Sequence, residues 1–198
     1  MLEQLQLFED EPDPTSREAK VATTQFEGRV QKLLEVMKRI TFNILVWGPS
    51  LRSQSTVAEK RRQIHRRLKD EKHHCWFSEE FADPPPGVSL KSYELAQAFE
   101  ADMIVMLVEA SAPGVIGEMH DFCNHKELLS KILLFFPKDM VNSYDGQGLV
   151  KELDEGYRIV EYYKEEDISS CSLLTKVLKW VQARRSYLYS HSSIGSGG

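Results

Sequence analysis

A single glutamate after a loop of small residues is the first candidate for chemistry in this sequence. The stretch from Ala101 to Glu118 reads ADMIVMLVEASAPGVIGE. Its apolar run, from Met103 to Val108, is long enough for a strand buried on both faces. We expect a helix to begin at Glu118, and in the first turn of a helix the dipole favours the ionised carboxylate.

The residues between this strand and Glu118 leave room for a ligand. Ser111, Gly114 and Gly117 have small side chains or none, so backbone N–H groups at the start of the helix can face an anion. Glu109 ends the strand at the same edge of the expected sheet. The alternative is that Glu118 only complements the helix dipole, as many glutamates near helix starts do.

A second candidate is the short run Trp47-Gly48-Pro49-Ser50, which ends an earlier apolar segment. Ser50 could donate a hydrogen bond to a phosphate or a ribose, and Trp47 could stack on a flat ring. The alternatives are a plain turn between a strand and a helix, and a tryptophan that belongs to the core. The motif is too short to choose between them.

Other groups are weaker candidates. The sequence has no Walker loop, GxGxxG, HExxH or GxSxG motif. We expect His73 and His74 to be a surface pair and Cys123 to be a core residue. Asp121 and His125 follow Glu118 at helical spacing, although His125 is two turns away.

Strands and helices alternate five times along the expected scaffold. The apolar runs predict strands at residues 41–47, 74–77, 103–108, 131–136 and 158–162. Helical patterns occupy residues 56–72, 89–100, 118–129, 149–155 and 168–189, with Gly156 as the expected C-cap glycine of the fourth. This alternation predicts an α/β fold with a doubly wound, five-stranded parallel sheet in the flavodoxin-like order 2-1-3-4-5.

In that order, the first and third strands lie side by side at the point where the chain reverses direction across the sheet. Trp47 to Ser50 and Glu109 to Ser111 would meet there, at the carboxyl ends of the strands.

The chain is expected to have three parts. Residues 1–40 combine an acidic lead-in with an extra amphipathic helix. Residues 41–189 form the α/β domain, and residues 190–198 form a Ser/Gly-rich tail that we expect to be disordered. The apolar stripe of the first helix predicts a homo-oligomer or a partner protein. That stripe contains Phe26, Val30, Leu33, Leu34 and Met37.

Composition narrows the function further. A net charge of -5 over 198 residues argues against nucleic acid as a partner. The 3 cysteines are widely spaced, which favours reduced thiols and a cytoplasmic protein over a disulfide framework or a zinc site. No apolar run reaches the ~18 residues of a membrane helix. Six basic residues between Lys60 and Lys69 are interpreted as a solvated helix face, with attraction of phosphate as the alternative.

Taken in order, these segments resemble the nucleoside 2-deoxyribosyltransferase-like superfamily, which neighbours the TIR-type NAD-cleaving domains. ILVWGPS resembles the first strand and substrate loop of that family, and AFEADMIVMLVEAS resembles the strand that ends at the ribose site. SAPGVIGEMHDF is similar to the segment that presents the catalytic glutamate, and KILLFFP to the next buried strand. The resemblance covers the chain from Thr41 to Tyr163.

The resemblance implies roles for individual residues. Glu118 would be the catalytic carboxylate that attacks the anomeric carbon or stabilises charge there. Gly48 and Ser50 would contact the base or the sugar, and Ser111 the ribose or a phosphate. The chain departs from the family in two places. Trp47 stands next to a position where a small residue is expected, and no aspartate matches the base-binding acid of the family.

Glu109 or Glu79 could replace that missing acid. The implied activity is cleavage of an N-glycosidic bond in a nucleotide or nucleoside. The basic helix favours NAD or a related nucleotide, as a substrate rather than a cofactor, and no metal is implied. Stand-alone domains of this class also act as antiphage defence effectors. The alternative is a non-catalytic nucleotide-sensing or scaffold module, because the same fold can bind without turnover.

Overall fold

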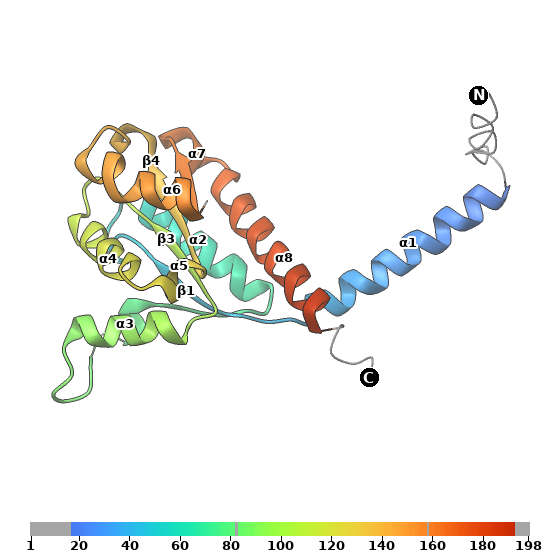
Figure 1. Cartoon of the computed structure of the whole chain (residues 1–198), viewed down its shortest axis with the longest axis horizontal. Coiled ribbons are helices and arrows are strands. Elements are labelled where there is room, and N and C mark those ends of the chain that lie inside the picture. The colour runs from blue at the N-terminus through green and yellow to red at the C-terminus, as the bar shows by residue number, and fades with distance from the viewer. Residues whose placement is uncertain (1–16, 82, 158, 193–198) are drawn as a thin grey trace, which may run out of the picture. The chain divides into compact units, whose positions relative to one another are not determined.

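The computed structural model describes residues 17–81, 83–157 and 159–192 (Figure 1). The chain divides into two compact units. One unit comprises residues 41–184, and the other comprises residues 1–40 together with residues 185–198. The expected acidic lead-in and residues 193–198 of the expected tail lie outside the described residues.

The larger unit contains the predicted sheet. Its five strands are all parallel, in the order β2-β1-β3-β4-β5. Their bounds are β1 Asn43–Trp47, β2 His74–Phe77, β3 Met103–Leu107, β4 Ile132–Pro137 and β5 Val160–Tyr163. The prediction of a flavodoxin-like parallel sheet in the order 2-1-3-4-5 is therefore confirmed.

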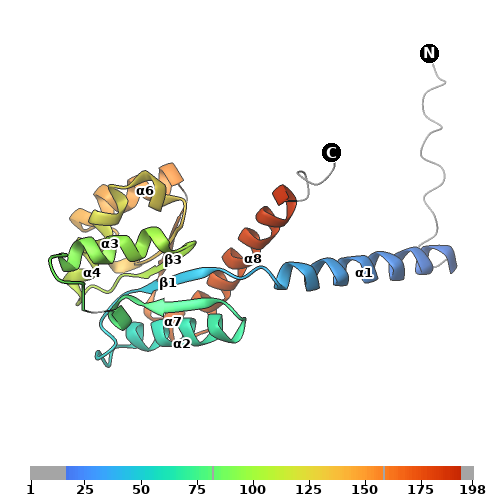
Figure 2. The same cartoon turned by 90° about the horizontal axis from the view of Figure 1, so that it is seen from below.

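Helices cover both faces of this sheet (Figure 2). One face carries α3 (Leu90–Glu100), α4 (Pro113–Cys123), α5 (Lys126–Leu129) and α6 (Lys151–Tyr157). The other carries α2 (Thr56–Asp70), α7 (Glu165–Ser169) and the part of α8 (Ser172–Ser192) that belongs to this unit. Short helical turns occupy Ser78–Phe81, Lys138–Met140 and Gly146–Val150.

The apolar runs form strands because alternate side chains are buried on opposite faces. Every residue of β3 is buried. Leu45, Ile104 and Leu134 contribute to the core beneath α3 and α4. On the other side, α2 packs on the sheet through an apolar stripe in which Ile64 and Leu68 are fully buried.

Local signals set several helix starts. Ser55 and Ser89 cap α2 and α3, and each side-chain oxygen accepts a backbone N–H at 3.1 Å. No side chain caps α4, which begins with Pro113. A proline at the first helical position loses no hydrogen bond, and its fixed φ suits the helix.

Three predicted helix boundaries are wrong. The helix expected over residues 118–129 begins at Pro113 and breaks at Asn124 and His125, before α5. Gly156 lies inside α6 rather than after its end, and its φ is not positive. It is therefore not the C-cap glycine that the sequence predicted. The helix expected over residues 168–189 is divided into α7 and α8, and α8 extends to Ser192.

The smaller unit contains α1 (Arg17–Lys38) and the C-terminal end of α8. The Nε atom of Arg185 donates to the carbonyl of Ile40 at 3.1 Å. On α1, Phe26 is 67% exposed and Leu33 is 38% exposed. Among the described residues, no helix combines the length and apolarity that crossing a bilayer would require.

Candidate active site

Glu118 lies in the second turn of α4, because the helix begins five residues earlier, at Pro113. The prediction that Glu118 occupies the first turn is therefore wrong, and the dipole argument for its ionised form no longer applies. The sequence signal that would have located the helix start is Pro113 itself, which favours the first helical position.

Trp47 holds the carboxylate of Glu118. The indole Nε1–H of Trp47, at the end of β1, donates a hydrogen bond to Oε2 of Glu118. The Trp47 side chain is 1% exposed, and its ring packs edge-on against Phe122 with centroids 4.6 Å apart. Of the two interpretations of Trp47, the core residue is therefore the one observed. A ring buried in this way has no free face on which a ligand could stack.

Glu118 lines a cavity of about 220 Å³ between α3 and α4. Lys91 and Asp121 form an ion pair of 2.6 Å at this cavity. The lining residues are Lys91, Glu94, Leu95, Glu118, Asp121, Phe122, Asn124 and His125. His125 therefore faces the same cavity as Glu118, although its sequence distance suggested that it was too far away. Glu94 and Lys91 on α3 had no sequence signal.

The environment of Glu118 opposes its ionisation. Burial, with a smaller contribution from the carboxylates of Glu94 and Glu79, raises the pKa of Glu118 to about 7, although the hydrogen bond from Trp47 and the charge of Arg61 work in the opposite direction. Burial also raises the pKa of Glu94, with Glu79 and Asp121 adding to the effect. A carboxyl group with a pKa near neutrality, at a cavity, is typical of residues that take part in catalysis.

Arg61 of α2 donates hydrogen bonds to the end of β1 and to the loop that follows it. The Arg61 side chain is fully buried and donates to the carbonyls of Val46, at 3.1 Å, and Pro49, at 2.9 Å. It also forms two hydrogen bonds, of 2.7 and 2.6 Å, to Glu79. Burial would raise the pKa of Glu79, but hydrogen bonding and the charge of Arg61 outweigh it and lower the pKa.

Gly48 is required in this loop because its backbone approaches β3 closely. A Cβ atom at Gly48 would lie 3.1 Å from the carbonyl oxygen of Leu107 and 3.2 Å from Cδ of Arg61. Gly48 and Pro49 are both buried, whereas Ser50 is exposed and its Oγ accepts the backbone N–H of Arg52 at 3.3 Å. Of this predicted substrate loop, Ser50 therefore has the most accessible side chain.

The basic face predicted for α2 is partly wrong. Lys60 is 5% exposed and donates to the carbonyl of Ser170 at 2.8 Å, and Arg61 is buried as described. Neither side chain is available for a phosphate. Arg66, Arg67 and Lys69 are exposed, as a solvated helix face requires.

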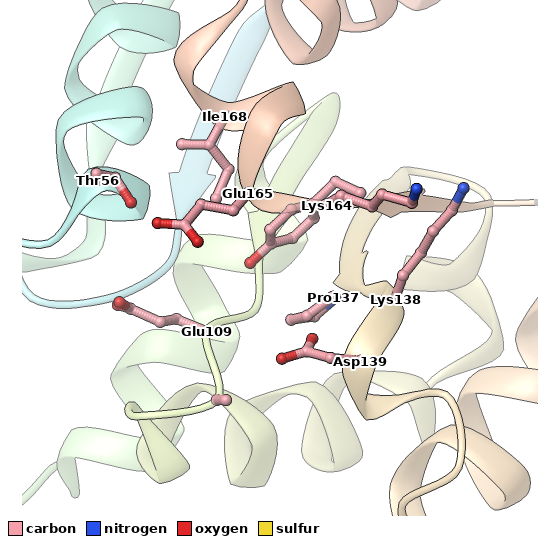
Figure 3. A pocket seen from close by; sticks show the side chains of 10 residues that line it. Thr56, Glu109, Pro137, Lys138, Asp139, Lys164, Glu165 and Ile168 are labelled. Carbon is pink, nitrogen blue, oxygen red and sulfur yellow. The ribbon is translucent and has the colours of Figure 1, made fainter.

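Glu109 belongs to a different cavity, at the carboxyl ends of β3, β4 and β5 (Figure 3). This edge pocket has a volume of about 350 Å³. Glu109 accepts a hydrogen bond of 3.0 Å from the hydroxyl of Ser55, the N-cap residue of α2. The pocket is lined by Thr56, Glu109, Ala110, Pro137, Lys138, Asp139, Tyr163, Lys164, Glu165 and Ile168.

The structure therefore separates two residues that the sequence placed at one site. Glu118 lines the cavity between α3 and α4, and Glu109 lines the edge pocket. Ser111, which lies between these two residues in the sequence, is exposed. Gly114 and Gly117 are exposed, and an added Cβ would meet no atom within 4 Å, but neither glycine lines the Glu118 cavity or the edge pocket.

The remaining candidates are structural. His73 is buried rather than exposed, accepts the backbone N–H of Phe42 at 3.1 Å and stacks on the Phe42 ring, so the prediction of a surface histidine pair is wrong. Burial raises the pKa of the Cys123 thiol to about 12, which disfavours a nucleophilic role. The described residues contain no cluster of three or more His, Cys, Asp or Glu side chains arranged to hold a metal ion.

The comparisons with known proteins assign no family. No protein-family model matches the chain, and no curated protein matches it significantly. The fold and the Glu118 cavity therefore carry the functional argument.

Proposed function

We propose that this protein cleaves the N-glycosidic bond of a nucleotide or nucleoside, with Glu118 as the catalytic carboxylate. The observation that supports this most is the position of Glu118. It lines a cavity, its pKa is raised to about 7 by burial, and one of its oxygens is held by the buried indole of Trp47. The resemblance of the segment around Glu118 to the glutamate segment of the nucleoside 2-deoxyribosyltransferase-like superfamily points to the same residue.

The proposed chemistry uses a single carboxylate. Breaking an N-glycosidic bond passes through an oxocarbenium-like transition state, and a carboxylate ~3 Å from the anomeric carbon stabilises its charge or traps it covalently. Trp47 fixes Oε2 of Glu118 and leaves Oε1 for the sugar. Because burial and neighbouring carboxylates destabilise the ionised form of Glu118, a cationic group in the cavity relieves that cost and lowers the pKa.

The lining favours a positively charged leaving group. Glu94 accompanies Glu118 at the cavity, where Asp121 is paired with Lys91, and a cationic nicotinamide can leave without being protonated. A neutral base would need a proton, and we propose Glu94, whose pKa is raised by burial, as the group that donates it. We therefore propose NAD or a related nucleotide as the preferred substrate, rather than as a cofactor.

The size of the cavity supports recognition of part of a nucleotide. Its volume of about 220 Å³ is below the ~300–1,000 Å³ of typical ligand pockets. The sugar and base would occupy it, and phosphates would extend past Lys91, whose side chain is 69% exposed at this cavity.

A paired-variant turnover assay tests the proposal. Purified protein is incubated with NAD and, separately, with 2′-deoxynucleosides, and the released base is measured by chromatography. Glu118→Gln, which keeps an acceptor for Trp47, should lower turnover ~10²–10³-fold, the range for losing one preorganised electrostatic contact. Glu109→Gln in the edge pocket is the matched control and should retain turnover within about threefold. Equal activity of Glu118→Gln and the unmodified protein would refute the proposal.

A second candidate function is nucleotide binding without turnover. The hydrogen bond from Trp47 to Glu118 also joins α4 to β1, which gives Glu118 a structural use that needs no catalysis. Binding of NAD by calorimetry, with no base released over hours at high protein concentration, would favour this candidate.

We also propose that α1 assembles two copies of the chain through its exposed apolar residues. Phe26 is 67% exposed and Val36 is 44% exposed. Replacing Phe26 and Leu33 together by glutamate should lower the mass measured by light scattering to that of a monomer. Gln31→Glu, on another face of α1, is the control. An unchanged mass in the double variant would exclude this assembly.

A further inference from the structure

A third concave site lies between α3 and the edge strand β2. It has a volume of about 330 Å³, and its wall is largely aromatic. Trp76 comes from β2, Phe81 from the helical turn that follows, and Tyr93 from α3. The complete lining is Trp76, Phe81, Tyr93, Ala96, Gln97 and Glu100. This aromatic groove has the size of a small-molecule site.

Gln97, one of the residues that line the groove, has a buried amide without a described hydrogen-bond partner. Gln97 is 8% exposed, and neither Oε1 nor Nε2 has a partner within the part of the chain that the structure describes. Most buried side-chain polar atoms in proteins are hydrogen-bonded. An unpaired primary amide destabilises the free protein, because both its donors and its acceptor have lost water. A leucine would fill the same position without that cost, so packing does not explain the amide.

The residues around Gln97 indicate which kind of ligand could form hydrogen bonds with its amide. A primary amide presents an acceptor and a donor side by side, which matches a planar group with adjacent donor and acceptor, as glutamine pairs with the N6 and N7 atoms of adenine. Aromatic side chains at the same groove offer faces on which a flat ring stacks. The described lining contains no lysine or arginine, and Glu100 carries the same sign of charge as a phosphate. An uncharged ring therefore fits better than a phosphorylated one.

This groove is distinct from the Glu118 cavity, although α3 contributes to both. Lys91, Glu94 and Leu95 face the Glu118 cavity, whereas Tyr93, Gln97 and Glu100 face the aromatic groove. At 3.6 residues per turn, these two sets lie on opposite sides of the helix.

We propose that the groove between α3 and β2 binds an uncharged heteroaromatic base, such as a free purine or a nicotinamide-like ring. The Gln97 amide, which is closed to solvent in the free protein, turns into the groove and pairs with the donor–acceptor edge of the base, and Trp76 and Tyr93 contact the face of the ring. The proposal concerns binding alone and does not depend on whether Glu118 is catalytic.

Nuclear magnetic resonance of the Gln97 side chain reports on this site specifically. The two amide proton signals of Gln97 are those that disappear in the Gln97→Leu variant. Titration of the full chain with adenine, and separately with nicotinamide, should shift these signals in a saturable way. Binding in the Glu118 cavity, on the far side of α3, would leave them largely unmoved.

Affinity measurements with matched probes complete the test. Gln97→Leu and Gln97→Met should bind adenine about tenfold more weakly, the effect of losing about two hydrogen bonds, and should melt no lower than the unmodified protein. Gln63→Leu, on the exposed surface of α2, is the control. Indole, a bicycle without the adjacent donor and acceptor, should bind equally to all of these proteins. Adenosine 5′-monophosphate should bind more weakly than adenine.

Two results would overturn the proposal. One is the absence of any shift of the Gln97 signals at millimolar adenine and nicotinamide. The other is indole binding as tightly as adenine to both the unmodified protein and Gln97→Leu, which would identify an apolar groove for side chains of a partner protein.

Discussion

Glu109 and Glu118 follow the same strand and are nine positions apart, yet the fold gives them different surroundings. Glu109 remains at the carboxyl edge of the sheet, accepts a hydrogen bond from Ser55, and lines an open pocket together with Lys138 and Lys164 (Figure 3). Glu118 lies against the face of the sheet, beside the buried Trp47, in a cavity where the other charged side chains include Glu94 and Asp121.

The comparison shows how a position between two helices changes the environment of a carboxylate. Solvent and a lysine can offset the charge of a carboxylate at the edge of the sheet. A carboxylate between two helices loses contact with water and lies close to other carboxylates. Burial is the largest cause of the raised pKa of Glu118. The candidate site therefore depends on how rigidly the end of β1 and the start of α4 are held together.

The largest effect is expected from removing Arg61, the buried cation that holds the end of β1. Arg61→Met should lower the free energy of unfolding by ~3–5 kcal/mol, because it leaves Glu79 and the carbonyls of Val46 and Pro49 without their donor. Chemical denaturation measures the change. If the loss is below about 1 kcal/mol, the end of β1 is not held by Arg61.

Arg62→Met is the matched control for this variant. The Arg62 side chain is 30% exposed, pairs with Glu59 on the surface of α2, and also donates to the carbonyls of Leu51 and Ser53. Exposed pairs of this kind contribute about 1 kcal/mol or less. The ratio of the two losses therefore measures how much of the effect comes from burial rather than from charge.

A smaller effect, dependent on pH, is expected from Glu118→Gln. The pKa of Glu118 rises from 4.5 to about 7 on folding, so the folded protein binds this proton more tightly than the unfolded chain does. The contribution of Glu118 to stability is complete below pH 4.5, falls as the pH rises toward 7, and changes little above that. Glutamine does not titrate, so the variant should gain stability relative to the unmodified protein over this range.

The gain should reach about 1–2 kcal/mol at pH 8, less than the full shift implies, because solvent screens part of the effect. Urea denaturation of both proteins at pH 4, 6 and 8 measures it. Parallel stability profiles of the two proteins would show that burial does not disfavour the ionised form of Glu118.

The smallest effect is expected from Trp47→Phe, which removes the donor to Glu118 and keeps a ring against Phe122. Because the hydrogen bond from Trp47 lowers the pKa of Glu118, its loss should move that pKa above about 7. Carbon-13 resonance titration of the Glu118 carboxyl group measures the shift, with Trp180→Phe on α8 as the control. A decrease in the pKa would mean that the hydrogen bond does not stabilise the ionised form.

Much of the scaffold was predictable because it depends on local patterns. Apolar runs such as Met103 to Val108 can be satisfied only by burial on both faces, and their alternation with helical patterns leaves few topologies. Asp102, directly before β3, fixes the start of the sheet, since its Oδ2 accepts the backbone N–H of Asn43 at 2.8 Å. Helix ends were less predictable, as the early start of α4 at Pro113 shows.

The site was predictable only in part. Glu118 could be proposed from its loop and its family resemblance, but its neighbours come from distant segments. Glu94 on α3 and Trp47 on β1 reach it only when both helices and the sheet are assembled. Arg61 was grouped with a solvated basic face because a run of cations is usually exposed. The acceptors that allow its burial, Glu79 and two carbonyls, are 12 to 18 positions away.

The sequence by itself determined the class of fold, the strand order and the presence of a glutamate beyond the third strand, because periodicity and strand–helix alternation are local properties. Only the tertiary structure decided that Glu118 and Glu109 line separate cavities, that Trp47 is a hydrogen-bond donor in the core, and that Gln97 is a buried amide without a described partner. These outcomes depend on burial and on partners far apart in the chain, and neither is fixed by the residues next to a position.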